Sequence, residues 1–205
     1  MADGGTVLDV GCGAGAASLP LVPPATALTA IDSSTEMLRA FAADAATRSV
    51  PYGLVEGRWP DVEALVAPAD LVVCHHVLYN VPDLVGFVLA LTAHARRRVV
   101  VELTEQHPLT ELGPLWRRFH DLERPAGPDA GLAVEVIAGT GVSVRQERWE
   151  RPRATVAAAE RVTLTRQRLC LTADRDGEVA AALEELGPTG PRQVRTLWWS
   201  GGAPG

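Results

Sequence analysis

Short apolar runs alternate with helix-like segments in the first half of the chain. The runs that predict β-strands cover residues 7–10, 27–31, 52–55, 69–74 and 98–103. A helix start is predicted over 16–21, and a longer helix is predicted over 84–95. Another helix follows Ser33, which lies three residues before Glu36 and forms a predicted capping box. Strands that alternate with helices at this pitch predict a parallel sheet with helices on both faces, a doubly wound α/β fold.

The pattern changes after residue 103. A separate helix is predicted over 108–122, interrupted at Gly113-Pro114, and a Pro/Gly-rich linker follows over 124–131. Beyond the linker, the pattern predicts helices at 133–138, 156–171 and 176–186 and strands at 142–149 and 193–199. The total is seven strands. A chain of 205 residues with 47% hydrophobic content can bury this set as one domain.

Charge and cysteine content exclude several partners. The formal net charge is −6, with acidic and basic residues mixed along most of the chain, so no basic surface for nucleic acid is expected. The three cysteines are far apart and form no CxxC pair, which predicts neither a disulfide framework nor a thiolate metal site. No apolar run approaches the ~20 residues of a membrane helix, and no signal segment follows Met1. We therefore expect a cytoplasmic protein that binds neither membranes nor nucleic acid.

The chain contains no lysine, and all its basic side chains apart from histidine are arginine. Schiff-base cofactor enzymes, Walker-type phosphate loops and protein kinases all need a lysine at the site, so these classes are excluded. Abundant Ala, Arg, Gly and Pro, with a single Asn, indicate GC-rich coding and a bacterial source.

The stretch VLDVGCGAGAA, residues 7–17, contains the main candidate binding loop. Gly11, Gly13 and Ala16 satisfy the dinucleotide fingerprint G-x-G-x-x-A, and Asp32 follows about 20 residues on, where it can bond ribose hydroxyls. NAD and S-adenosylmethionine both place a ribose at such a position. A carboxylate at Asp9, just before the loop, repels a pyrophosphate and attracts an ammonium or sulfonium group. The loop is therefore expected to prefer a cation.

Three segments taken together resemble a known family. VLDVGCGAG, AIDSSTEML and ADLVVCHHVLYNVPD, in this order and spacing, are similar to motifs of the class I S-adenosylmethionine-dependent methyltransferases. The resemblance covers residues 7–103 by motif and the remainder by architecture. It implies a three-layer Rossmann-like α/β fold with a mostly parallel seven-stranded sheet in the order 3-2-1-4-5-7-6, the last strand antiparallel. It also implies one domain, 1–205, with a cofactor-binding half at 1–103 and a substrate-side insert with the C-terminal strands at 104–205.

The resemblance also implies roles for particular residues. Asp9 would face the methionine ammonium, and Asp32 would hold both ribose hydroxyls. The other implied cofactor contacts are Gly11, Cys12, Gly13 and Gly15 along the methionyl part, Ser33 and Met37 beside ribose and adenine, and Cys74 and His75 at the end of the fourth strand.

The chain departs from the family pattern in two places. Gly57-Arg58-Trp59 stands where members usually have Gly-Asp-Ala, so the carboxylate that meets the adenine amino group is missing. Arg58 and Trp59 are the expected contacts there, with Trp59 either stacking on adenine or closing a loop against the body. Only six residues precede the first strand, and we expect that the helical segment that covers the cofactor in this family is missing through truncation.

Candidate catalytic residues follow the fourth strand, at the carboxyl edge of the sheet, where open α/β folds bind ligands. His76 and Tyr79 are candidates for a general base, or they form substrate walls without proton chemistry. No metal site is expected, because Cys74, His75 and His76 are neighbours on a strand and point to alternating faces. Acceptor selection is expected from the segment up to residue 131, which contains Glu105, His107, Trp116, Phe119 and His120.

Three functions remain open on the sequence alone. The leading one is methyl transfer from S-adenosylmethionine to a small organic acceptor by in-line displacement. The second is an NAD(P)-dependent oxidoreductase built on the same loop, and the third is a non-catalytic S-adenosylmethionine-binding partner subunit.

Overall fold

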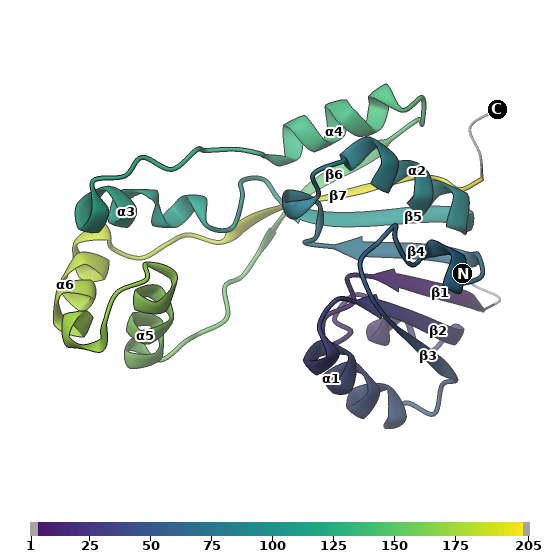
Figure 1. The fold of residues 1–205 in the computed structure, drawn as a ribbon, viewed down its shortest axis with the longest axis horizontal. Coiled ribbons are helices and arrows are strands. Elements are labelled where there is room, and N and C mark those ends of the chain that lie inside the picture. Colours follow the sequence, from purple (N-terminus) through teal and green to yellow (C-terminus); the bar gives the residue numbers. More distant parts are fainter. Residues whose placement is uncertain (1–3, 203–205) are drawn as a thin grey trace. The chain divides into compact units, whose positions relative to one another are not determined.

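The computed structural model describes residues 4–202, so residues 1–3 and 203–205, at the ends of the predicted domain, lie outside it. One sheet has the strand order β3-β2-β1-β4-β5-β7-β6 (Figure 1). Its strands are β1 (Gly5–Val10), β2 (Ala25–Asp32), β3 (Tyr52–Glu56), β4 (Ala69–His75), β5 (Ala95–Thr104), β6 (Arg145–Arg151) and β7 (Arg192–Ser200). The predicted fold class and strand order are confirmed.

Strands β1 to β5 pair in parallel, and β7 runs antiparallel to β5. Two backbone hydrogen bonds fix the direction of β7: Gly201 donates to the carbonyl of Arg97 at 3.0 Å, and Glu105 donates to the carbonyl of Gln193 at 3.0 Å. Residue numbers rise along β5 as they fall along β7, which is the antiparallel pattern. The carboxyl ends of β1, β2, β4 and β5 therefore share one edge of the sheet.

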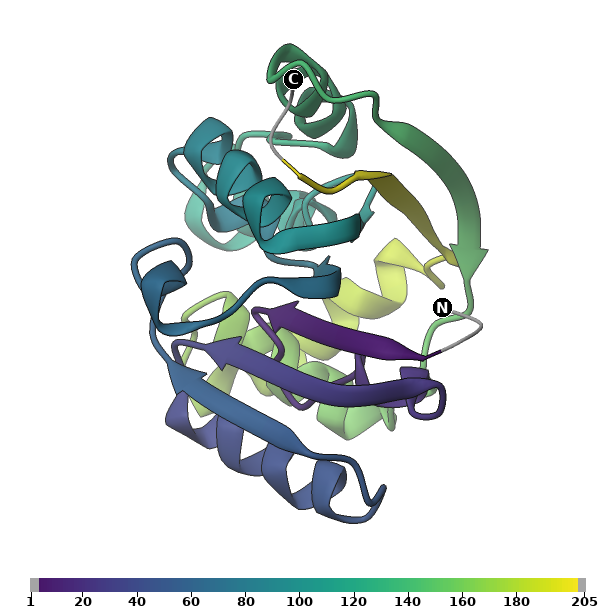
Figure 2. The ribbon, with the colours of Figure 1, turned by 90° about the vertical axis from the view of Figure 1, so that its right-hand side faces the viewer.

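Three of the six longer helices cover the two faces of this sheet. The longer helices are α1 (Thr35–Ala46), α2 (Leu84–His94), α3 (Gly113–His120), α4 (Ala130–Gly139), α5 (Ala158–Arg168) and α6 (Asp176–Leu186). Short 3₁₀ turns are η1 (Leu19–Leu21), η2 (Glu63–Leu65), η3 (Leu78–Asn80), η4 (Thr110–Leu112) and η5 (Ala173–Arg175). Figures 1 and 2 show α1 on one face and α2 with α4 on the other, and each face has its own buried core cluster. Both faces of the parallel sheet are therefore shielded from water, as its apolar strands require.

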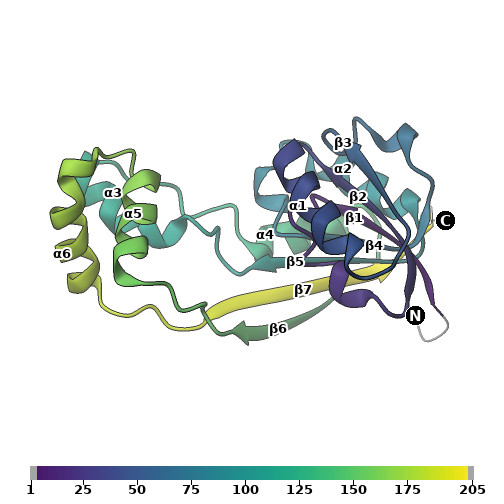
Figure 3. The same cartoon turned by 90° about the horizontal axis from the view of Figure 1, so that it is seen from below.

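The chain divides into two compact units. The sheet unit comprises residues 1–103, 130–148 and 195–205, and the helical unit comprises 104–129 and 149–194. In the helical unit, α3, α5 and α6 pack together around a small core that includes Leu115, Leu169 and Val179 (Figure 3). In the described part of the chain, no helix combines the length and the apolar character that a membrane crossing requires.

Three local predictions are wrong. The helix expected over 16–21 is only the turn η1, because Pro20 and the prolines that follow it leave too little chain for helical hydrogen bonds. The cap of α1 is Ser34 rather than Ser33, and its hydroxyl accepts from the backbone N–H of Met37 at 3.3 Å. The pair Gly113-Pro114 begins α3 instead of interrupting a helix, since proline suits the first turn, where no N–H is needed.

Two helix and strand ranges in the second half also shift. Helix α4 starts at Ala130, inside the predicted linker, and strand β6 covers Arg145–Arg151 rather than 142–149. The prediction for α6, 176–186, agrees with the structure at both ends.

Candidate functional site

The glycine loop leaves the end of β1 with three glycines at positive φ, of which Gly11 and Gly13 have different surroundings. Gly11 has a φ of 71°, and its N–H donates to the carbonyl of Ile31 at 2.8 Å. A Cβ at Gly11 would meet Cγ2 of Val77 at 2.4 Å, so the loop after β4 lies directly against this backbone. Gly13 has a φ of 51°, and a Cβ there would meet no described atom within 4 Å. The backbone at Gly13 is therefore open to a ligand, whereas Gly11 is needed for close packing.

The other two residues predicted in this loop face the interior. A Cβ at Gly15 would lie 2.4 Å from Leu19 and 2.9 Å from Phe41, so Gly15 permits packing of the loop on the core. The Cys12 side chain is 5% exposed, and burial raises the pKa of its thiol, with the nearby Asp9 charge adding to the effect. Both positions are buried, so neither offers a side chain to a ligand.

Asp32, at the end of β2, organises the loop. One carboxylate oxygen accepts from the backbone N–H of Gly13 at 2.9 Å, and the other accepts from that of Ser34 at 2.9 Å. These bonds join the glycine loop to the start of α1. Because each oxygen can accept a second hydrogen bond, the half-buried carboxylate can still bind hydroxyl groups.

Asp9 is almost completely buried beneath the loop, with 1% of its surface exposed. Its Oδ2 accepts from the hydroxyl of Ser18 at 2.6 Å, and its Oδ1 has no hydrogen-bond partner among residues 4–202. Burial raises the pKa of Asp9 to about 6, the Ser18 hydrogen bond opposes this rise, and the negative charge of Asp32 adds to it. A buried carboxylate oxygen without a donor favours a positively charged or hydrogen-bonding ligand.

The residues predicted around the adenine lie in different environments. Ser33 is exposed beside the cap of α1, Met37 is half-buried in the first turn of that helix, and Arg58 is exposed. Trp59 is 8% exposed and packs edge-to-face on His94, with 4.8 Å between ring centroids. Its ring belongs to the core, so it closes the loop and does not offer a face for stacking.

The end of β4 brings together residues with separate roles. Cys74 is fully buried, and burial raises the pKa of its thiol, so it fills the core. His75 is half-buried on the opposite face of the strand, as the alternation of side chains requires. Within the part of the chain that the structure covers, no group of three or more His, Cys, Asp or Glu residues could hold a metal ion.

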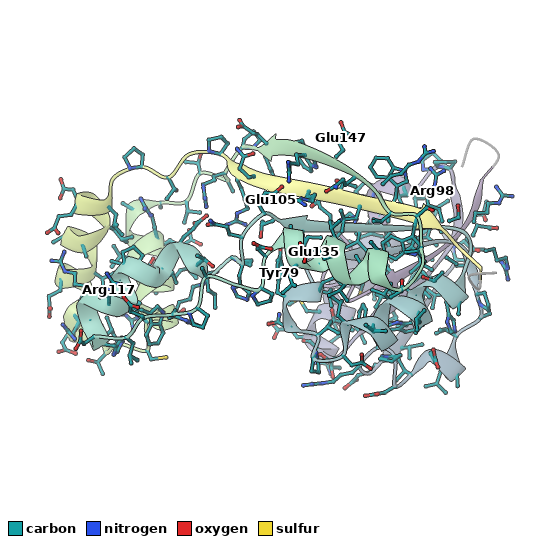
Figure 4. All side chains as sticks on the ribbon, turned by 90° about the horizontal axis from the view of Figure 1, so that it is seen from above. Tyr79, Arg98, Glu105, Arg117, Glu135 and Glu147 are labelled. Carbon is teal, nitrogen blue, oxygen red and sulfur yellow. The ribbon has the colours of Figure 1, made fainter. Side chains whose placement is uncertain are left out.

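His76 forms a close pair with Glu102 of β5. His76 has a left-handed φ of 60°, and its N–H donates to the Glu102 carbonyl at 2.7 Å. Its Nε2 lies 3.1 Å from Oε1 of Glu102, whose side chain is 7% exposed against 34% for the histidine. A carboxylate that accepts from Nε2–H favours the tautomer with the lone pair on Nδ1. Tyr79 (Figure 4) follows in η3 and packs partly against the core.

Sequence reasoning missed Glu102. It is the one acidic residue in the apolar strand segment RVVVEL, and a buried charge within a strand requires a partner. That signal could have drawn attention to it before the structure was known.

The predicted acceptor segment divides into two groups inside the helical unit. Glu105 (Figure 4) and His107 line a pocket of about 290 Å³. Trp116 and Phe119 pack in the helical core instead, and Nε2 of His120 lies 2.7 Å from the carbonyl oxygen of Leu169. The structure therefore places two of the five residues at a pocket and gives the other three a packing role.

Comparison with known proteins gives a match to one family model and a set of similar folds. Residues 7–98 match a family model described as a methyltransferase domain. No curated protein sequence matches the chain.

Three solved structures illustrate the likeness in fold. The YcgJ protein of Bacillus subtilis is 15% identical, with a TM-score of 0.64, and the match covers 97% of this chain and 92% of that one. A magnesium protoporphyrin IX methyltransferase from Synechocystis PCC 6803, solved with bound SAH, is 16% identical with a TM-score of 0.61, covering 97% and 74%. A SAM-dependent methyltransferase from Archaeoglobus fulgidus is 13% identical with a TM-score of 0.55, covering 95% and 85%.

Proposed function

We propose that the protein transfers a methyl group from S-adenosylmethionine to a small organic acceptor, because residues 7–98 match a family model described as a methyltransferase domain. Solved structures with the same fold include enzymes crystallised with SAH or SAM, which supports this choice of cofactor.

One observation carries the proposal. Two carboxylates, Asp9 and Asp32, lie at a glycine loop whose backbone is open at Gly13, and Oδ1 of Asp9 is buried without a donor among the described residues. An ammonium group would supply the missing donor and would offset the cost of the buried charge. A pyrophosphate would place negative charge against the same oxygen, so the NAD(P)-dependent alternative is disfavoured.

The chain's residues would then hold the cofactor as follows. Asp32 would accept from the ribose hydroxyls through the second lone pairs of its oxygens. The main chain of Gly11, Cys12, Gly13 and Gly15 would border the methionyl part, with Cys74 and His75 beyond it. Ser33, Met37 and Arg58 would border the ribose and adenine, while Trp59 would support the loop from within the core.

Methyl transfer requires alignment of the acceptor with the methyl group, and a hydroxyl or amine acceptor must also lose a proton. When bound, S-adenosylmethionine supplies an electrophilic methyl group. Positioning at near-attack distance contributes about 7–11 kcal/mol in well-oriented systems. We assign His76 as the general base: Glu102 would hold Nε2–H, so that Nδ1 takes the proton of a hydroxyl or amine acceptor. Tyr79 would form a wall of the same site.

Calorimetry with S-adenosylhomocysteine and NAD tests the cofactor assignment. We expect S-adenosylhomocysteine to bind and NAD to bind at least about tenfold more weakly, since Asp9 opposes a pyrophosphate. Asp32→Ala should weaken S-adenosylhomocysteine binding at least about tenfold, through lost charge-assisted hydrogen bonds, without unfolding the domain by circular dichroism. Asp44→Ala, an exposed carboxylate on α1, is the matched control and should leave the affinity unchanged.

Two outcomes would overturn the assignment. Tight binding of NAD alone would favour the oxidoreductase, and unchanged affinity in Asp32→Ala would remove the ribose contact. A chain that binds S-adenosylhomocysteine and methylates no member of a broad acceptor panel would support the non-catalytic partner subunit. The expectation of a bacterial, cytoplasmic protein stays a prediction.

A further inference from the structure

The helical unit contains a polar pocket of about 290 Å³. Its lining comes from the end of β5 and the segment after it, from the start of β7 and the residue before it, and from Arg153. Ligand sites commonly have volumes of about 300–1,000 Å³, so this pocket suits a small molecule. None of the residues that we assign to the cofactor lines it.

Hydrogen bonds fix the walls of this pocket. Arg153 donates through Nε to the carbonyl of Gly190 at 2.7 Å, and its guanidinium also pairs with Glu111. The backbone N–H of Glu105 donates to the carbonyl of Gln193 at 3.0 Å. These contacts join the two lining segments, so the pocket is formed before any ligand binds, which lowers the entropic cost of binding.

The two arginines of the lining differ in whether they form an ion pair with another residue. Arg153 is neutralised by Glu111, whereas Arg192, half-buried in the same lining, forms no ion pair with any residue of 4–202. Nδ1 of His107 accepts from the N–H of Leu109 at 3.1 Å, so the neutral ring carries its proton on Nε2 as a donor. The pocket therefore presents a guanidinium that no described residue neutralises.

We propose that this pocket binds a small organic acid whose carboxylate pairs with Arg192. The planar guanidinium matches a carboxylate through two parallel hydrogen bonds. Because Arg192 is the one lining arginine without an ion pair among residues 4–202, the ligand that we propose is a monocarboxylic acid. The binding inference stands on the pocket alone, and the ligand's role as the methyl acceptor rests on the proposed function.

Ligand-observed NMR on the full chain tests the proposal with matched probe pairs. The acids are benzoate and phenylacetate, and their neutral counterparts are benzamide and phenylacetamide. We expect at least one acid to bind with a Kd below about 10 mM and its amide to bind at least about tenfold more weakly. Arg192→Gln should weaken the acid at least about tenfold, and Arg192→Lys should retain part of the affinity as a point charge.

Two controls separate this site from the cofactor site. Arg168→Gln makes the same charge change at an exposed position of α5, outside the pocket, and should leave acid binding unchanged. S-adenosylhomocysteine affinity should be the same in all these variants, so a failure of the proposed function is recognised independently. The proposal is overturned when no acid of the panel binds, when acids and amides bind equally, or when Arg192→Gln binds the acid as the wild type does.

Discussion

Asp9→Asn should make the protein more stable at neutral pH. The pKa of Asp9 rises from 3.8 to about 6 because the side chain is buried, despite the hydrogen bond from Ser18. Two pKa units correspond to about 3 kcal/mol of free energy of unfolding. Asparagine has the same shape, keeps an oxygen for the Ser18 hydroxyl and never ionises.

The sign follows from proton binding. Between about pH 4 and pH 6 the folded state binds the Asp9 proton more tightly than the unfolded state does, so this residue lowers stability as pH rises. The penalty is absent below the unfolded pKa and complete above the folded one. The Asn variant should therefore match the wild type near pH 4 and exceed it by up to about 3 kcal/mol above pH 7.

Urea denaturation followed by circular dichroism, at several pH values between about 4 and 8, measures this difference. Hydrogen exchange of the β1 amides locates the effect in the sheet unit. A stability difference that is constant with pH, or an Asn variant that is less stable at pH 8, would refute the reasoning. The same substitution should weaken S-adenosylhomocysteine binding, since the ammonium would lose its counter-charge.

Two further predictions concern the pair at the end of β4 and the thiols. Once an acceptor is known, His76→Gln should lower kcat by about 10²–10⁴-fold while the affinity for S-adenosylhomocysteine stays constant. Glu102→Gln should lower kcat by a smaller factor. An unchanged kcat in His76→Gln would exclude His76 as the general base. Of the three free cysteines, only Cys170 is exposed, and burial raises the pKa of Cys12 and Cys74. Ellman's reagent should therefore label one thiol rapidly in the native protein and three in urea, and rapid labelling of a second native thiol would contradict the burial of the other two.

Periodicity and glycine spacing were sufficient to predict most of the sheet. Apolar runs bounded by turn residues predicted the first five strands, because a strand in a covered parallel sheet leaves a short apolar signature. The last two strands were predicted from the pattern of the second half of the chain. The predicted start of β6 was three residues too early. This strand lies at the edge of the sheet, is largely exposed and carries no apolar run that would mark its bounds. The cap of α1 was misplaced because adjacent serines, Ser33 and Ser34, are equivalent in sequence and differ only in backbone geometry.

The site was less accessible to sequence reasoning. His76 and Glu102 are 26 residues apart in the sequence, and they meet because β4 and β5 are neighbours in the sheet. No local sequence pattern predicts such a contact. Trp59 was compatible with a stacking role until its burial against His94 was seen. Arg192 had no motif at all, and only the pocket reveals that the chain leaves its charge unpaired among the described residues.

The two hydrogen bonds of Asp32 to Gly13 and Ser34 have a kinetic consequence. They order the loop during folding, before any nucleoside arrives. Association should then proceed as a single step at a rate near that of simple encounter, with no slow isomerisation after contact. Without the Asp32 carboxylate, the loop would become ordered only when the ligand binds. This ordering step would be visible as a second relaxation phase in stopped-flow traces.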